Sequence, residues 1–276
     1  MTGQTQVLRP SLLARYPISA YFVIAYAFSW AIGGLLIADY YGWLSVPQAI
    51  YYLSAFGPTV GAVVVIGATE GRAGLRHLLG RMLRAGVAVR WWLVAVGMPL
   101  AFGGVAILIY WAERGAPPDL ARFGEVDYLG QIGVGAALLL WLATYGFGEE
   151  IGWRGFALQR MMTPTRWIQP AVIIGVLWSF WHLPYFFFKP NFMALGAGGF
   201  VFFTLTITLG SLFMSWLYRS SGQSLLIVAV WHALFDFVSA SPIAEGTANA
   251  VISGLVVAAV ISILRAEARR DRKAAL

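Results

Sequence analysis

The stretch 134–160 reads VGAALLLWLATYGFGEEIGWRGFALQR and decides what kind of protein this is. Its first half is apolar enough to enter a membrane, and its second half carries two adjacent glutamates and an arginine. If one helix continues through both halves, Glu149 and Glu150 lie inside the bilayer. If the helix ends at Gly148, the polar half forms a helix on the cytoplasmic surface instead. The rest of the sequence favours the longer helix.

The composition is that of a membrane protein. Of the 276 residues, 59% are hydrophobic and only 11% are charged, whereas soluble domains carry about 25% charged residues. The net charge of +7 would suggest nucleic-acid binding in a soluble chain, but here the basic residues lie in short gaps between apolar runs, where they set topology. We therefore expect a lipid bilayer and no nucleic acid as partner. The lack of cysteine excludes disulfides and Cys-ligated metals.

About eight apolar runs are long enough for transmembrane helices, which need about 20 residues each. We place these runs at 17–38, 48–68, 91–112, 130–160, 168–188, 195–217, 223–240 and 246–265. No linker or internal repeat divides the chain. The sequence therefore predicts an all-α polytopic membrane protein, a single transmembrane domain over 1–276, with a polar active-site cavity inside the membrane.

The basic residues are distributed unevenly between these runs. Most of the 19 Lys and Arg residues fall at the two ends of the chain and in alternate gaps, whereas acidic residues gather in the other gaps. Basic segments stay on the cytoplasmic side of a membrane, so both termini are predicted to be cytoplasmic. The Ala-, Gly- and Arg-rich composition indicates a bacterial source and hence the cytoplasmic (inner) membrane.

Two further patterns concern packing. Gly57 and Gly61 form a Gly-x-x-x-Gly pair, which is typical of close helix contact. Over 75–83, apolar residues recur at helical spacing with arginines between them, a pattern that predicts a helix lying on the inner membrane face.

Ionisable side chains in the hydrocarbon interior are by default functional, because burying them there is costly. The chain has three histidines, and two of them, His182 and His232, lie in apolar runs. At about 1.5 Å per residue, both lie near the middle of the bilayer, and so does Glu149 if its helix continues to Arg160. Ending that helix at Gly148 would leave the carboxylates far from both histidines. The matching depths of these residues in the bilayer therefore favour the long helix, which places the polar groups in one shared layer.

The carboxylates in this layer have different expected roles. Neighbouring residues on a helix point about 100° apart, so Glu149 and Glu150 do not face the same atom. Glu150 and Arg154 are four residues apart with the acid first, which favours a structural ion pair. Glu149 has no such local partner and is the candidate general base. His232 and Asp236 share a helix face in the same way, although each histidine alone also fits a packing role.

Three strings together resemble the CPBP family of intramembrane proteases, which includes CAAX proteases and bacteriocin-processing (Abi) enzymes. They are GEEIGWRG at 148–155, WSFWH at 178–182 and HALFD at 232–236. They match E-E-x-x-x-R, an aromatic residue followed by x-x-x-H, and H-x-x-x-N or D. The motif-bearing core is about 128–240. The resemblance implies eight helices and an endopeptidase that cuts peptide bonds in or near the membrane.

The resemblance also implies a role for each motif residue. Glu149 and His182 would activate water, and His232 and Asp236 would stabilise the oxyanion. Because a carboxylate donates a hydrogen bond only when protonated, Asp236 would instead orient His232 or ligate a metal. A glutamate mechanism without metal is preferred here. One divalent ion such as zinc, held by Glu149, His182, His232 and Asp236, is the alternative.

The expected substrates are membrane-associated peptides that are lipidated or carry a leader. Two other functions fit the same residues. A catalytically inactive scaffold would bind membrane helices without cutting them, so that Glu149 would be dispensable. A proton-coupled transporter would also place His, Glu and Asp at the membrane middle, but it predicts an inverted repeat with broken helices, and the sequence gives no convincing sign of either.

Overall fold

The computed structural model describes residues 12–163 and 165–274. This part of the chain is built of helices, with one small antiparallel hairpin of β1 (Glu125–Val126) and β2 (Gly130–Gln131). The predicted all-α class is therefore confirmed. The predicted domain 1–276 includes two chain ends that lie outside the described residues.

The helical elements follow one another along the chain, and three of them (η2, η4 and η5) are π-helical. They are α1 (Leu12–Arg15), α2 (Pro17–Tyr40), η1 (Gln48–Ile50), α3 (Tyr51–Ser54), α4 (Gly57–Thr69), α5 (Gly71–Met82), α6 (Val89–Trp92), η2 (Leu93–Gly97), α7 (Met98–Arg114), η3 (Leu120–Gly124), α8 (Val134–Trp141), η4 (Leu142–Glu149), α9 (Glu150–Gly152), η5 (Trp153–Leu158), α10 (Gln159–Met161), α11 (Ile168–Trp181), η6 (Leu183–Phe187), α12 (Pro190–Met193), α13 (Gly196–Ser220), α14 (Leu225–Ser239), η7 (Pro242–Ala244) and α15 (Thr247–Ala274).

Each of the predicted apolar runs is helical. Among the described residues, five helices are long and apolar enough to cross a membrane, and the pair α3 and α4, bent by 42°, counts as a sixth if it is one span. The two other predicted runs are the helical segment 134–161, which contains the motif charges, and α14, which has 15 residues. The chain is an all-α polytopic membrane protein.

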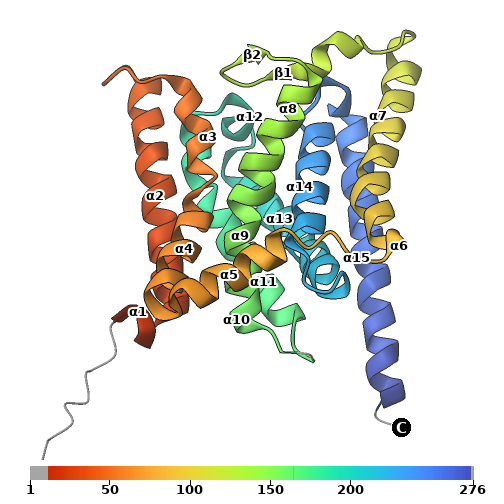
Figure 1. The fold of residues 1–276 in the computed structure, drawn as a ribbon. Coiled ribbons are helices and arrows are strands. Elements are labelled where there is room, and N and C mark those ends of the chain that lie inside the picture. The colour runs from red at the N-terminus through yellow and green to blue at the C-terminus, as the bar shows by residue number, and fades with distance from the viewer. Residues whose placement is uncertain (1–11, 164, 275–276) are drawn as a thin grey trace, which may run out of the picture.

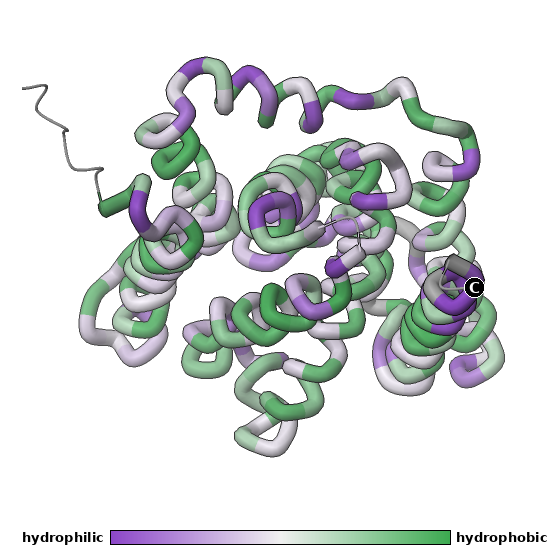
Figure 2. Tube along the Cα trace, turned by 90° about the horizontal axis from the view of Figure 1, so that it is seen from below, coloured by the Kyte–Doolittle hydropathy of each residue, from purple (hydrophilic) through white to green (hydrophobic). Residues whose placement is uncertain are grey.

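The outer surface of the bundle is apolar. Leu93, Leu139, Phe202 and Leu205 are large side chains that are each more than half exposed, and a soluble protein rarely exposes so many. Figure 2 shows hydrophobic positions around the periphery of the bundle, with hydrophilic ones at the near end of the C-terminal helix. This distribution is expected where lipid covers the helices.

The long helices run side by side, and their two ends differ (Figure 1). At one end, here called the basal end, α5 crosses beneath the bundle, and α1 and the last turns of α15 lie there as well. The other end, here called the hairpin end, carries β1, β2, α3 and α12. The helix predicted to lie on the membrane surface is thus α5, whose Leu78 is buried against the bundle.

Glycines set how closely the helices approach one another. A Cβ atom on Gly57 would lie 2.5 Å from the carbonyl oxygen of Ala25, and one on Gly61 would lie 2.9 Å from that of Tyr21. These contacts confirm the predicted close packing, which here joins α4 to α2. Gly152 does the same for α9, because a Cβ there would lie 2.5 Å from the carbonyl of Pro58. Gly152 therefore lets α4 press against the helix that carries Glu149.

Candidate active site

The helix that carries the two glutamates continues through them. Helical residues run without a break from Val134 to Met161, as α8, η4, α9, η5 and α10, which confirms the longer of the two predicted helices. The π-helical segments η4 and η5 flank the glutamates, and such segments are frequent at functional sites. The hydroxyl of Thr59 donates to the carbonyl oxygens of Gly148 at 2.7 Å and Phe147 at 3.2 Å, so that two carbonyls of η4 are satisfied from α4.

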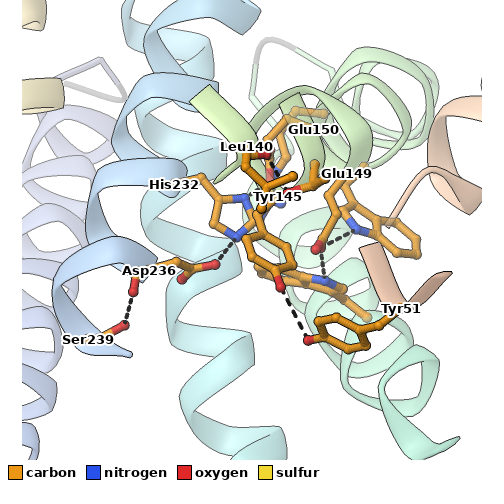
Figure 3. A network of polar contacts seen from close by, with 12 residues as sticks. Tyr51, Leu140, Tyr145, Glu149, Glu150, His232, Asp236 and Ser239 are labelled. Atoms are coloured by element: carbon orange, nitrogen blue, oxygen red, sulfur yellow. Dashed lines mark hydrogen bonds and ion pairs between the residues drawn. The ribbon is translucent and has the colours of Figure 1, made fainter. Parts of the chain in front are cut away.

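Glu149 is buried and held by indole groups. Its Oε2 accepts a hydrogen bond of 2.7 Å from the Nε1–H of Trp178 on α11, and a longer one of 3.4 Å from Trp153 on its own helix. Only 2% of the residue is exposed. Figure 3 shows these contacts beside Glu149. The carboxylate that lacked a local partner in the sequence is thus positioned by a donor from another helix.

His182 follows directly on the last residue of α11. Its Nδ1 lies 2.8 Å from the carbonyl oxygen of Trp178. A carbonyl oxygen only accepts, so the hydrogen of this bond belongs to Nδ1. In the neutral ring, Nε2 is then an acceptor, able to hold or deprotonate a water molecule.

His232 lies between two carboxylates. Its Nδ1 is 2.9 Å from Oε1 of Glu150, and its Nε2 is 3.3 Å from Oδ2 of Asp236 (Figure 3). Nδ1 has no partner with hydrogen-bond geometry among the described residues, so its contact with Glu150 is a close approach only. Glu150 also pairs with Arg154 at 2.8 Å, and neither of these two side chains is exposed. The two i, i+4 pairs predicted from spacing are present, whereas the contact between Glu150 and His232 was not predicted.

Trp178 joins the polar groups into one layer. It donates to Glu149, its ring centroid lies 5.3 Å from that of His232 and 5.8 Å from that of His182, and the guanidinium of Arg154 lies 5.0 Å from its centre. No role in the site is predicted for Trp178 from the sequence. The available signal was its position four residues before His182, which places both on one face of α11.

Whether the site could bind a metal ion depends on the contacts that its His, Asp and Glu side chains already make. Within residues 12–163 and 165–274, no group of three or more His, Asp and Glu residues is placed to hold one. Both nitrogens of His232 face carboxylates, and one oxygen of Glu149 is bound by indoles. In this arrangement the four predicted ligands, Glu149, His182, His232 and Asp236, do not form a metal-binding set.

Known proteins resemble the motif-bearing part of the chain. Residues 131–238 match the family model described as type II CAAX prenyl endopeptidase Rce1-like. The CAAX prenyl protease 2 of Methanococcus maripaludis is 26% identical over 103 residues, which is 36% of this chain and 37% of that protein. The match thus spans little more than a third of the relative's length. The resemblance carried by the three motifs is confirmed: the segment 131–238, which contains all three, is similar to the Rce1-like type II CAAX prenyl endopeptidases.

Proposed function

We propose that the chain is an intramembrane endopeptidase that hydrolyses peptide bonds of membrane-associated substrates, either lipidated peptides or peptides with a leader. The observation that carries the proposal is the buried layer in which Trp178 contacts Glu149, His182 and His232. In this layer Glu149 can act as a general base, and Nε2 of His182 can accept a hydrogen bond from water. The ring of His232, between two carboxylates, can stabilise an oxyanion. Hydrolysis of an amide needs these three functions.

Glu149 and His182 activate the attacking water in this proposal. One oxygen of Glu149 is fixed by Trp178, so the carboxylate keeps its orientation and its second oxygen takes a proton from the water. His182 Nε2 accepts the other hydrogen of the same water. The hydroxide adds to the substrate carbonyl, and Glu149 returns the proton to the departing amine as the C–N bond breaks.

His232 faces the negative charge that develops on the carbonyl oxygen. Glu150 and Asp236 hold its ring from both sides. Asp236 is the partner that is free to move, since 30% of its side chain is exposed while that of Glu150 is fully buried. When substrate binds, Nε2–H turns from Asp236 to the oxyanion. Asp236 is then an orienting group rather than a donor.

Arg154 supplies a fixed cation to this arrangement. The carboxylate of Glu150 is fully buried and needs such a partner, and Arg154 pairs with it at 2.8 Å. We assign Glu150 and Arg154 a supporting role. No step of this mechanism passes through a metal.

We further propose that both termini face the cytoplasm of a bacterial cell, with the protein in the inner membrane. The support is that α1 and the last turns of α15 both lie at the basal end of the bundle (Figure 1). Protease protection of tags at the two ends, in inverted and right-side-out vesicles, tests this orientation.

The experiment for the activity compares purified wild type, Glu149→Gln and Glu70→Gln on a quenched peptide library, with and without a membrane anchor. Glu70 is a matched control because its carboxylate pairs with Arg160 at the basal end, away from the site. Wild type and Glu70→Gln should cut anchored peptides, and Glu149→Gln should not. A chelator should leave the rates unchanged.

Other outcomes favour the alternatives. Equal cutting by wild type and Glu149→Gln would contradict the glutamate mechanism, and loss of cutting with chelator would favour a metal. If wild type binds anchored helices but cuts none, the protein is a scaffold. Proton-coupled uptake into proteoliposomes without cleavage would identify a transporter.

A further inference from the structure

A second set of polar groups lies between the catalytic layer and the hairpin end of the bundle. It consists of Lys189, Asp127, Tyr51, Tyr145 and Tyr185, here called the Lys189 cluster. Tyr185 lies on η6, and Lys189 follows it. Asp127 lies between β1 and β2, Tyr51 begins α3, and Tyr145 lies on η4. The cluster is therefore assembled from four segments far apart in the sequence (Figure 1).

The ammonium group of Lys189 is buried and surrounded by oxygen atoms and rings. Its Nζ donates to Oδ2 of Asp127 at 2.7 Å and to the hydroxyl of Tyr51 at 3.2 Å. It also lies 4.3 Å from the ring centre of Tyr51, a distance at which a cation is attracted to the ring face. Only 8% of the lysine side chain is exposed.

Two hydrogen-bond donors of the cluster have no acceptor among the described residues. An ammonium group has three hydrogens, and the polar contacts of Lys189 use two of them. The hydroxyl of Tyr51 accepts from Lys189 and, at 3.3 Å, from Tyr145, so its own hydrogen is not engaged in the described part of the chain. A cation with one spare hydrogen, next to a hydroxyl with another, is suited to a carboxylate.

The cluster is close to the catalytic layer. The ring centroid of Tyr51 lies 5.3 Å from that of Tyr185, which lies 5.5 Å from that of His182. Tyr145 comes four residues before Glu149 on the same helix and contacts Tyr51 directly (Figure 3). Two ring-to-ring steps correspond to about three residues of an extended peptide, at about 3.3 Å each. Three residues beyond the scissile bond are therefore enough to span the distance from the catalytic layer to the cluster.

The present counterion of Lys189 is largely exposed. Asp127 belongs to the turn of a two-stranded hairpin, and 62% of its side chain is exposed. A buried cation must keep an anionic partner, but Asp127 satisfies this need from a segment that contacts solvent. A substrate carboxylate that takes its place would leave Asp127 hydrated and Lys189 paired.

We propose that Lys189 and Tyr51 bind a carboxylate of the peptide substrate, and that Asp127 occupies this position when no substrate is present. The proposal rests on the proposed function, because it names which substrates that site accepts. The carboxylate is either the free C-terminus of the peptide or an Asp or Glu side chain near the cut. Lys189 and Tyr51 are thus specificity-determining residues outside the catalytic layer.

The test uses three anchored peptides that differ only in charge: one with a free C-terminus, its C-terminal amide, and an amide with one acidic side chain beyond the cut. Wild type should cut at least one carboxylate peptide about tenfold better in kcat/KM than the neutral amide, mainly through KM, as expected for a lost charge-assisted hydrogen bond. Which carboxylate peptide is preferred identifies the source. Lys189→Met and Tyr51→Phe should reduce this preference, and Lys189→Arg should restore part of it.

The variant Asp127→Asn distinguishes a substrate-binding role of Lys189 from a role in which its ion pair with Asp127 only holds the hairpin in place. If Asp127 competes with the substrate, Asp127→Asn lowers KM for the preferred peptide. If the pair only fastens the hairpin, Asp127→Asn and Lys189→Met slow all three peptides equally, and the proposal is wrong. Equal rates of wild type on all three peptides also overturn it.

Binding to Glu149→Gln makes failure of this proposal distinguishable from failure of the proposed function. Affinities of the three peptides are measured with this variant, which removes the catalytic carboxylate. A preference for a carboxylate peptide supports the site even if wild type cuts nothing. Equal affinities overturn the site even if wild type is a protease.

Discussion

Two buried cations with carboxylate partners lie in the described part of the chain, and the two pairs are built differently. Arg154 and Glu150 lie one turn apart on one helix, 2.8 Å from each other, with no part of either side chain exposed. Lys189 and Asp127 are 62 residues apart, 2.7 Å from each other, with the lysine buried and most of the aspartate side chain in solvent. The first pair lies in the catalytic layer and the second lies above it.

This difference indicates what each pair does. A pair with both members desolvated cannot lose one partner without leaving an isolated charge in a medium of low dielectric. Such a pair is suited to fixing a structure, here the ring of His232. A pair with one exposed member can exchange it for another anion, and this is the property that a binding site needs. The experiments below test the contrast, starting with the largest expected effect.

Arg154→Met should destabilise the fold by about 3–5 kcal/mol, because it leaves the carboxylate of Glu150 buried without its cation. Unfolding in mixed micelles measures this loss. Arg160→Met is the matched control, since Arg160 pairs with the partly exposed Glu70 and should cost about 1 kcal/mol or less. Similar losses in the two variants would break the distinction between a buried and an exposed pair.

Gly152→Ala should destabilise the protein by about 1–3 kcal/mol, because the new methyl group overlaps the backbone of Pro58 on α4. The same unfolding assay applies. Gly135→Ala on α8 is the control, since nothing lies within 4 Å of its added Cβ, and it should change stability by no more than about 1 kcal/mol. If both changes are neutral, close packing of α4 does not position the catalytic layer.

Trp178→Phe should lower the cleavage rate about tenfold while changing stability by about 1 kcal/mol, because Glu149 loses its shorter hydrogen bond. Peptide cleavage and unfolding are measured in parallel. Trp181→Phe is a close control: Nε1 of Trp181 is buried and has no hydrogen-bond partner among the described residues. If the two variants lose equal activity, the indole donor of Trp178 does not orient Glu149.

Asp127→Asn should change stability by less than about 1 kcal/mol, since its carboxylate is largely exposed and an exposed partner contributes little. This is the smallest effect in the series and the counterpart of Arg154→Met. The unfolding midpoint measures it. A loss of several kcal/mol would show that Asp127 fixes the structure as firmly as Glu150 does.

Much of the catalytic layer could be predicted because its contacts are local in sequence. Glu150 with Arg154, and His232 with Asp236, are i, i+4 pairs that helical geometry alone brings together. The continuation of the helix past Glu149 followed from matching depths across three helices. The apolar runs gave the all-α polytopic fold because length and hydropathy decide what enters a bilayer.

The contacts that were missed join distant segments. The hydrogen bond from Trp178 to Glu149 spans 29 residues, and the one from Lys189 to Tyr51 spans 138. Neither contact joins residues at a regular spacing, such as i, i+4, that can be recognised in the sequence. The contact between Glu150 and His232 was missed for the same reason, because it depends on how α14 packs against the glutamate helix. The π-helical turns around Glu149 also depend on packing, here on the hydroxyl of Thr59.

The central claim is that Glu149 activates water for peptide-bond hydrolysis. The most direct measurement is mass spectrometry of the products formed from an anchored peptide in H₂¹⁸O, by wild type and by Glu149→Gln. We predict one ¹⁸O atom in the new C-terminal carboxylate with wild type, and no product above background with the variant. Labelled product formed equally by both proteins, or none formed by wild type, would contradict the claim.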